Sequence, residues 1–218
     1  MPALEHAGGS SPAAAPAIAV RSPLVRRGAL ALLVGGPLGL VFHVLWKVGH
    51  GPTVVNEHGV VLGLTNDQWS YLAAVWTVPV ALGVVAACSL HRGRLSRVAA
   101  VLVVLGLAAS TVAAWVWELY SAGALLLNAG VLCLSVVILR GRLLPRWSAW
   151  ILLLALVSFV PLAVANDAVL SMSTTALPFR VQGEDVITFL AALGWTALGL
   201  ALFRVAGGAG TSPRAPGR

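Results

Sequence analysis

The segment WVWELY, residues 115–120, places one carboxylate among aromatic side chains. Glu118 follows a run of 20 uncharged residues, and its neighbours are Trp115, Trp117 and Tyr120. A carboxyl group shielded by indole rings has a raised pKa, which is what a general acid requires. We expect Glu118 to end an outward-going helix, where the macrodipole disfavours a negative charge. Glu118 is therefore the first candidate catalytic residue, and the three aromatic residues are candidate substrate-binding residues.

Three further acids are candidates for a second catalytic carboxylate. Glu57 lies in a long loop beside His58, Asp167 follows the fifth apolar run, and Asp185 begins the sixth. An acid that has delivered its proton must be recharged, so we expect at least one of the three within a water-bridged hydrogen bond of Glu118. The alternative is structural, because Asp185 is suited to cap a helix and Asp167 to be solvated.

Four more residues are candidates for the wall of a pocket. His43 and Asn128 are polar groups inside apolar runs, and such groups face the interior of a helix bundle. Trp76 lies deeper than an interfacial aromatic belt explains, and Trp69 begins the same run. Aromatic faces attract cations, so acids and indoles together suit an apolar substrate that passes through positive charge.

No metal or other cofactor is predicted. His43, Lys47 and His50 recur at helical spacing, but HxxxH and HExxH pairs are absent. The chain also contains no aspartate-rich DDxxD cluster, Walker A loop, GxSxG or CxxC motif.

The elements that carry these residues are predicted to be membrane-spanning helices. The mean hydropathy of the 218 residues is +0.92, and only 10% of them are charged. Charged residues divide the chain into six uncharged runs of 18 to 23 residues. About 20 residues of helix cross the hydrocarbon core of a bilayer. The sequence therefore predicts an all-α fold, a six-helix transmembrane bundle whose partner is the lipid bilayer.

The basic residues predict the orientation of this bundle. Twelve of the fourteen Lys and Arg residues lie in four clusters: residues 21–27, 92–97, 140–146 and the tail from 204. These clusters alternate correctly for one side of a six-span protein, so the positive-inside rule places both termini in the cytoplasm. The net charge of +7 is a topology signal, and no nucleic-acid partner is predicted.

The chain is predicted to form one domain with two tails. Residues 1–25 form a disordered cytoplasmic tail, residues 26–205 the bundle, and residues 206–218 a flexible basic tail. Thirteen Arg against one Lys, with abundant Ala, Gly and Val, indicate a GC-rich bacterial genome and hence a bacterial cytoplasmic membrane. The long loops 47–68 and 167–185 are expected to fold over the outer ends of the helices. Glycines in GGPLG, residues 35–39, are expected to permit close helix approach.

The segments WELY and LLLNAGV (125–131) resemble the fungal membrane-bound terpene cyclases of meroterpenoid and indole-diterpene pathways, and small bacterial analogues. Those enzymes are all-helical membrane proteins with a Trp-Glu pair in a comparable helix and a second acid in the last helix. The resemblance implies that Glu118 protonates an epoxide or terminal alkene. This chain has six predicted spans where that family has seven, and Asp185 is its nearest substitute for the second acid.

Two functions follow from these observations. The first is an acid-initiated cyclisation of an isoprenoid substrate in an acidic, Trp-rich pocket at the outer face. The second is a non-enzymatic multi-pass membrane protein, either a small-solute permease or an accessory subunit.

Overall fold

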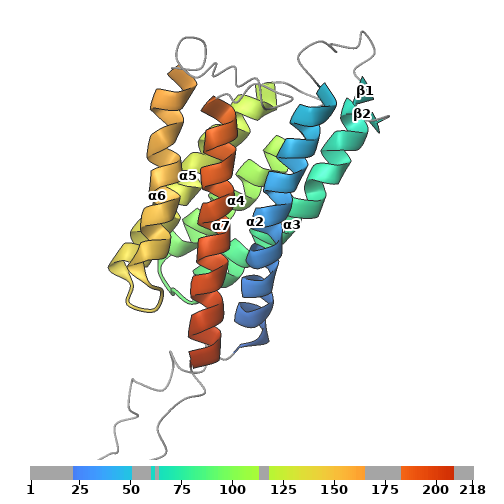
Figure 1. The fold of residues 1–218 in the computed structure, drawn as a ribbon. Coiled ribbons are helices and arrows are strands. Elements are labelled where there is room, and N and C mark those ends of the chain that lie inside the picture. Colours follow the sequence, from blue (N-terminus) through green and yellow to red (C-terminus); the bar gives the residue numbers. More distant parts are fainter. Residues whose placement is uncertain (1–21, 51–59, 62–63, 113–117, 165–182, 209–218) are drawn as a thin grey trace, which may run out of the picture.

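The computed structural model of the protein describes residues 22–50, 60–61, 64–112, 118–164 and 183–208. In this part of the chain every long element is a helix (Figure 1). The helices are α2 (Pro23–His50), α3 (Asn66–Ser89), α4 (Arg94–Val112), α5 (Glu118–Arg140), α6 (Arg146–Val164) and α7 (Gly183–Gly208). Each predicted apolar run corresponds to one helix, so the all-α prediction is confirmed.

The outer surface of these helices is apolar, as a bilayer requires. Within the described residues, five helices are long and apolar enough to cross a membrane, while the apolar part of α6 spans only Arg146–Ser158. Large apolar side chains point outward along the bundle, among them Leu125 at 71% exposure and Val157 at 67%. Such a surface is unfavourable in water and favourable in lipid. The chain is a multi-pass membrane protein.

The six helices form a closed ring. Each packs against the next in the chain, and α7 returns to pack along α2. The beginning of α2, the end of α7 and the short turns α3–α4 and α5–α6 lie at the same end of the bundle (Figure 1). This end is called the basic end below, and the opposite end is called the cavity end.

Glycines allow some of these helices to approach closely. A Cβ added at Gly36 of α2 would lie 2.5 Å from Thr196 Oγ1 and 2.8 Å from the Ala192 carbonyl oxygen, both on α7. At Gly106 of α4 it would lie 2.5 Å from the backbone nitrogen of Leu127 on α5. Packing at small residues is the usual contact between helices in a membrane. The predicted role of the GGPLG glycines is therefore confirmed at Gly36.

The packed core fills the basic-end half of the bundle. The fully buried side chains there come from all six helices, among them Val25, Leu32, Val84, Val103, Leu134, Ile138, Ala149, Leu198 and Leu202. The turn between α3 and α4 is closed by a buried Ser96 hydroxyl, which donates to the Cys88 carbonyl oxygen at 2.7 Å. Cys88 and Cys133 are free thiols.

A small hairpin precedes α3 and was not predicted. Strands β1 (Val60–Val61) and β2 (Leu64–Thr65) pair antiparallel, with Val60 opposite Thr65 and Val61 opposite Leu64. The hairpin contacts α2 through β1 and α3 through β2. This part of the first long loop therefore packs beside the helix ends.

Charges separate to the two ends of the bundle. All nine arginines whose side chains are described are exposed at the basic end: Arg26, Arg27, Arg92, Arg94, Arg97, Arg140, Arg142, Arg146 and Arg204. At the cavity end, acidic residues stand in the first turns of α3 (Asp67), α5 (Glu118) and α7 (Glu184, Asp185). A helix N-terminus favours a negative charge, so these positions are electrostatically favourable.

The position of Glu118 corrects one expectation. The sequence was interpreted as ending the third span at Glu118, where the macrodipole disfavours an acid. In the structure α4 ends at Val112, and Glu118 is the first residue of α5. The misplacement arose because an uncharged run gives the length of a helix but does not mark where the chain turns between two helices. The macrodipole therefore favours the Glu118 carboxylate and does not by itself indicate catalysis.

Candidate ligand cavity

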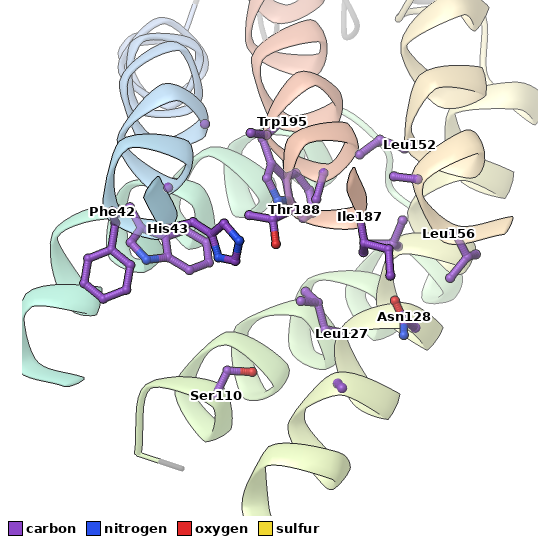
Figure 2. Close-up of a pocket in the computed structure, with 18 residues that line it drawn as sticks. Phe42, His43, Ser110, Leu127, Asn128, Leu152, Leu156, Ile187, Thr188 and Trp195 are labelled. Atoms are coloured by element: carbon purple, nitrogen blue, oxygen red, sulfur yellow. The ribbon is translucent and has the colours of Figure 1, made fainter. Parts of the chain in front are cut away.

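A cavity of about 310 Å³ lies inside the ring at the cavity end. All six helices contribute to its wall, and Figure 2 shows side chains of α2, α5, α6 and α7 around a common space. Its volume is at the lower end of the range for small-molecule sites, about 300–1,000 Å³. The eighteen lining residues are Gly36, Gly39, Phe42, His43, Trp76, Ser110, Ala124, Leu127, Asn128, Val131, Leu152, Ala155, Leu156, Ile187, Thr188, Ala191, Ala192 and Trp195.

Aromatic and aliphatic side chains form most of the wall. Trp195 of α7 is 5% exposed and sits where α7 packs into the core, and Phe42 lines the cavity from α2 (Figure 2). Trp76 of α3 packs against α2, since a Cβ added at Gly39 would lie 3.1 Å from its Cε3 atom. The Trp76 Nε1–H group is buried and has no acceptor among the described residues. The absence of a side chain at Gly39 thus makes room for one indole of the wall.

Four small polar side chains interrupt the apolar wall, one from each of four helices. They are His43 on α2, Ser110 on α4, Asn128 on α5 and Thr188 on α7 (Figure 2). The Ser110 hydroxyl donates to the Gly106 carbonyl oxygen of its own helix at 2.8 Å, and His43 and Thr188 also have interaction partners. The Asn128 amide has no hydrogen-bond partner among the described residues.

The cavity wall is uncharged apart from any proton on His43. None of the eighteen lining residues is Asp, Glu, Lys or Arg. The described arginines lie at the opposite end of the bundle. The wall therefore suits an apolar molecule with one or a few neutral polar groups.

The structure brings together three of the predicted pocket residues. His43, Trp76 and Asn128, predicted from polar or aromatic character inside apolar runs, all line the cavity. Trp69 or Trp76 was expected to line a cavity shared with Glu118; Trp76 borders this cavity, and the Glu118 side chain is outside the described part of the structure.

The other predicted site residues are placed by backbone alone or lie outside the described residues. Trp69 belongs to α3, Glu118 and Tyr120 to α5, and Asp185 to α7. The cavity begins on α5 at Ala124, which is six residues, or about 9 Å of helical rise, from Glu118. Glu57, Trp115, Trp117 and Asp167 are outside the described part of the chain.

Several lining residues were not predicted, although the sequence holds a signal for some. On α7, Thr188, Ala191, Ala192 and Trp195 lie at positions i, i+3, i+4 and i+7, which form one face of a helix. Ser110 is a polar group inside an apolar run, the signal that identified Asn128, and it was missed, whereas no periodic pattern marks Phe42. Their place in the wall follows from the rotation of α2 and α4 within the ring.

A metal site is not visible in the described part of the chain. No group of three or more His, Cys, Asp or Glu side chains is close enough together there to hold an ion. His91, in the turn after α3, has a buried Nε2 atom with no partner among the described residues, and burial lowers the pKa of its imidazole. His91 lies at the basic end, outside the cavity.

Comparison with known proteins adds nothing to this geometry. No family model, curated protein or solved structure matches the chain. The resemblance to membrane-bound terpene cyclases stays a prediction from two short segments. What is shown is a helical multi-pass membrane protein with an apolar cavity inside its ring of helices.

Proposed function

We propose that this protein binds a hydrophobic small molecule in the cavity and catalyses its acid-initiated cyclisation, with an isoprenoid as the substrate. The observation that carries the binding step is the cavity itself, whose wall combines Phe42, Trp76 and Trp195 with a few neutral polar groups. An apolar ligand partitions into the bilayer and reaches such a site from there. Indole faces next to the ligand stabilise positive charge as it develops on carbon.

Glu118 is the proposed proton donor. It begins α5, the helix that contributes Asn128 and three other residues to the wall. A helix N-terminus favours the carboxylate form, so proton delivery by Glu118 depends on the aromatic residues that flank it in the sequence. Glu57, Asp167 or Asp185 is the proposed partner that returns the proton.

We also propose the orientation and location of the bundle. The nine exposed arginines face the cytoplasm, so both termini are cytoplasmic and the cavity end faces outward. The arginine-rich composition supports a bacterial cytoplasmic membrane.

One observation favours the second function, a membrane protein without catalysis. No carboxylate is among the eighteen described residues of the cavity wall. A permease or accessory subunit needs the apolar site but no acid at its wall.

Comparing Glu118→Gln with the wild type tests the cyclase. Glutamine keeps the size and hydrogen bonding of the side chain but has no acidic proton to deliver. With a farnesyl- or geranylgeranyl-bearing substrate, we expect product formation to fall by roughly 10²-fold or more. Glu184→Gln removes an acid from the first turn of α7 and serves as the matched control, with activity unchanged.

The other outcomes discriminate between the two functions. Equal activity in Glu118→Gln and wild type would remove Glu118 from the mechanism. Substrate that binds to the wild type without forming product would support the non-enzymatic alternative. Failure of the wild type to bind any apolar ligand would reject both the cyclase and the binding site.

A further inference from the structure

Asn128 is a polar group of the cavity wall that has no partner on another helix among the described residues. It lies ten residues into α5, surrounded on its own helix by the lining residues Ala124, Leu127 and Val131. Its side-chain amide offers two donors and an acceptor with two lone pairs. None of these has a hydrogen-bond partner among the described residues.

Such a group is costly unless something in the cavity binds it. Asn128 is partly buried, an amide without a partner is unfavourable in an apolar environment, and polar residues within membrane helices most often serve function. The hydroxyls of Ser110, Ser135 and Thr196 avoid this cost by donating to carbonyl oxygens of their own helices. An amide cannot satisfy both its donors and its acceptor in this way, so Asn128 requires a partner from outside its helix.

The charge distribution limits what this partner is. No Lys or Arg is among the described residues of the cavity wall, and the described arginines are at the other end of the bundle. A diphosphate or carboxylate in the cavity would be desolvated without a counter-ion among the described residues, which is strongly unfavourable. A neutral hydroxyl, carbonyl or ether oxygen meets the amide without this cost.

We propose that the ligand is a neutral molecule with a single oxygen function that hydrogen-bonds to Asn128, and an apolar remainder that packs against the aromatic wall. This inference rests on the proposed binding of a hydrophobic molecule in the cavity and specifies its chemical class. Asn128 is about 15 Å of helical rise from Glu118 at the start of α5. A ligand anchored by its oxygen at Asn128 therefore has its apolar end free to extend toward the cavity end of the bundle.

Three probes of one carbon skeleton test the inference on the purified full-length protein in detergent: farnesol, farnesene and farnesyl diphosphate. Binding is followed by quenching of tryptophan fluorescence, since Trp76 and Trp195 line the cavity. We expect farnesol to bind about three- to tenfold more tightly than farnesene, as one net hydrogen bond predicts. Farnesyl diphosphate is expected to bind more weakly than either.

Asn128→Leu replaces the amide by an apolar group of similar size. In this variant the ratio of the affinity for farnesol to the affinity for farnesene should fall to about one. Micelle partition affects the wild type and the variant equally and cancels in this comparison. Ser135→Ala is the matched control, because Ser135 is a buried residue of α5 outside the cavity. Ser135→Ala should keep the wild-type ratio of the two affinities. If Asn128→Leu lowers the yield of folded protein, Asn128→Ala carries the same comparison.

The outcomes separate this inference from the proposed function. Two results would overturn the inference and leave the apolar binding site intact. One is an unchanged ratio of farnesol affinity to farnesene affinity in a folded Asn128 variant. The other is binding of farnesyl diphosphate as tight as that of farnesol. If neither farnesol nor farnesene binds the wild type, the proposed binding site itself is rejected, and this inference with it.

Discussion

The two halves of the bundle contain the same kinds of helix but are packed differently. At the basic end, side chains such as Leu32, Leu134 and Leu202 are fully buried and fill the space between the helices. At the cavity end the same six helices leave about 310 Å³ between them. Because both halves are apolar, hydropathy does not distinguish them. The difference lies in side-chain size and polarity at the positions that face inward.

The glycine contacts show how one ring supports both kinds of packing. Gly36 brings α2 against α7 and Gly106 brings α4 against α5, so these pairs are tightly joined along the cavity. The backbones of these helices are fixed in place. Bulky side chains that point inward, such as Trp76 and Trp195, therefore line the cavity and do not fill it. The basic end thus supplies stability, while the cavity end gives up part of it for a binding site.

The largest expected effect concerns the sides of the membrane on which the two ends lie. A reporter fused after Arg204 should be cytoplasmic and one inserted at Thr53 should be external, because the arginine clusters resist translocation. Sidedness is an all-or-none property, and paired reporters active on only one side of the membrane measure it. A cytoplasmic signal from the Thr53 insertion would show that the basic and cavity ends have been assigned to the wrong sides.

A pair of leucines on α5 compares the packing of the two ends. Leu134 is fully buried in the core, whereas Leu127 is partly buried and lines the cavity. We expect Leu134→Ala to lower the free energy of unfolding by about 2–5 kcal/mol, and Leu127→Ala by less than half of that, because Leu127 already borders empty space. Unfolding in mixed detergent micelles measures both changes. Equal losses would mean that the cavity end is packed as tightly as the basic end.

A smaller effect concerns pH and the turn at the basic end. Burial lowers the pKa of His91 below its ordinary value of 6.5, so the folded protein binds this proton less readily than the unfolded chain does. The contribution of the neutral imidazole to the free energy of unfolding is therefore complete above pH 6.5. It is lost as the pH falls from about 6.5 toward the lower pKa of His91 in the folded state. Thermal midpoints between pH 8 and pH 5 should fall more for the wild type than for His91→Gln. Parallel pH curves for the two proteins would contradict the burial of His91.

Part of the candidate site was predictable because membrane helices constrain polar residues strongly. His43 and Asn128 stand out in apolar runs, and Trp76 lies too deep for an interfacial belt. Each property belongs to the residue and its own helix, so no tertiary information was needed. The role of Phe42 depends on the rotation of α2 against α3 and α7, which no local pattern encodes.

Glu118 shows the limit of the same reasoning. Its aromatic neighbours identified it, but an uncharged run does not reveal where one helix ends and the next begins. The structure assigns Glu118 to the start of α5, where the macrodipole favours its charge. A shift of a few residues in the helix boundary thus changed the expected effect of the macrodipole on the Glu118 carboxylate from unfavourable to favourable.

The sequence by itself determined the number of helices and the gathering of arginines at one end. Bilayer thickness and the positive-inside rule act on each segment separately, so these features can be found by following the chain. Only the tertiary structure decided that α7 closes the ring against α2 and that the space inside lies at one end. Those features depend on contacts between helices distant in sequence, such as Gly36 with Thr196, where a single added carbon would force the helices apart.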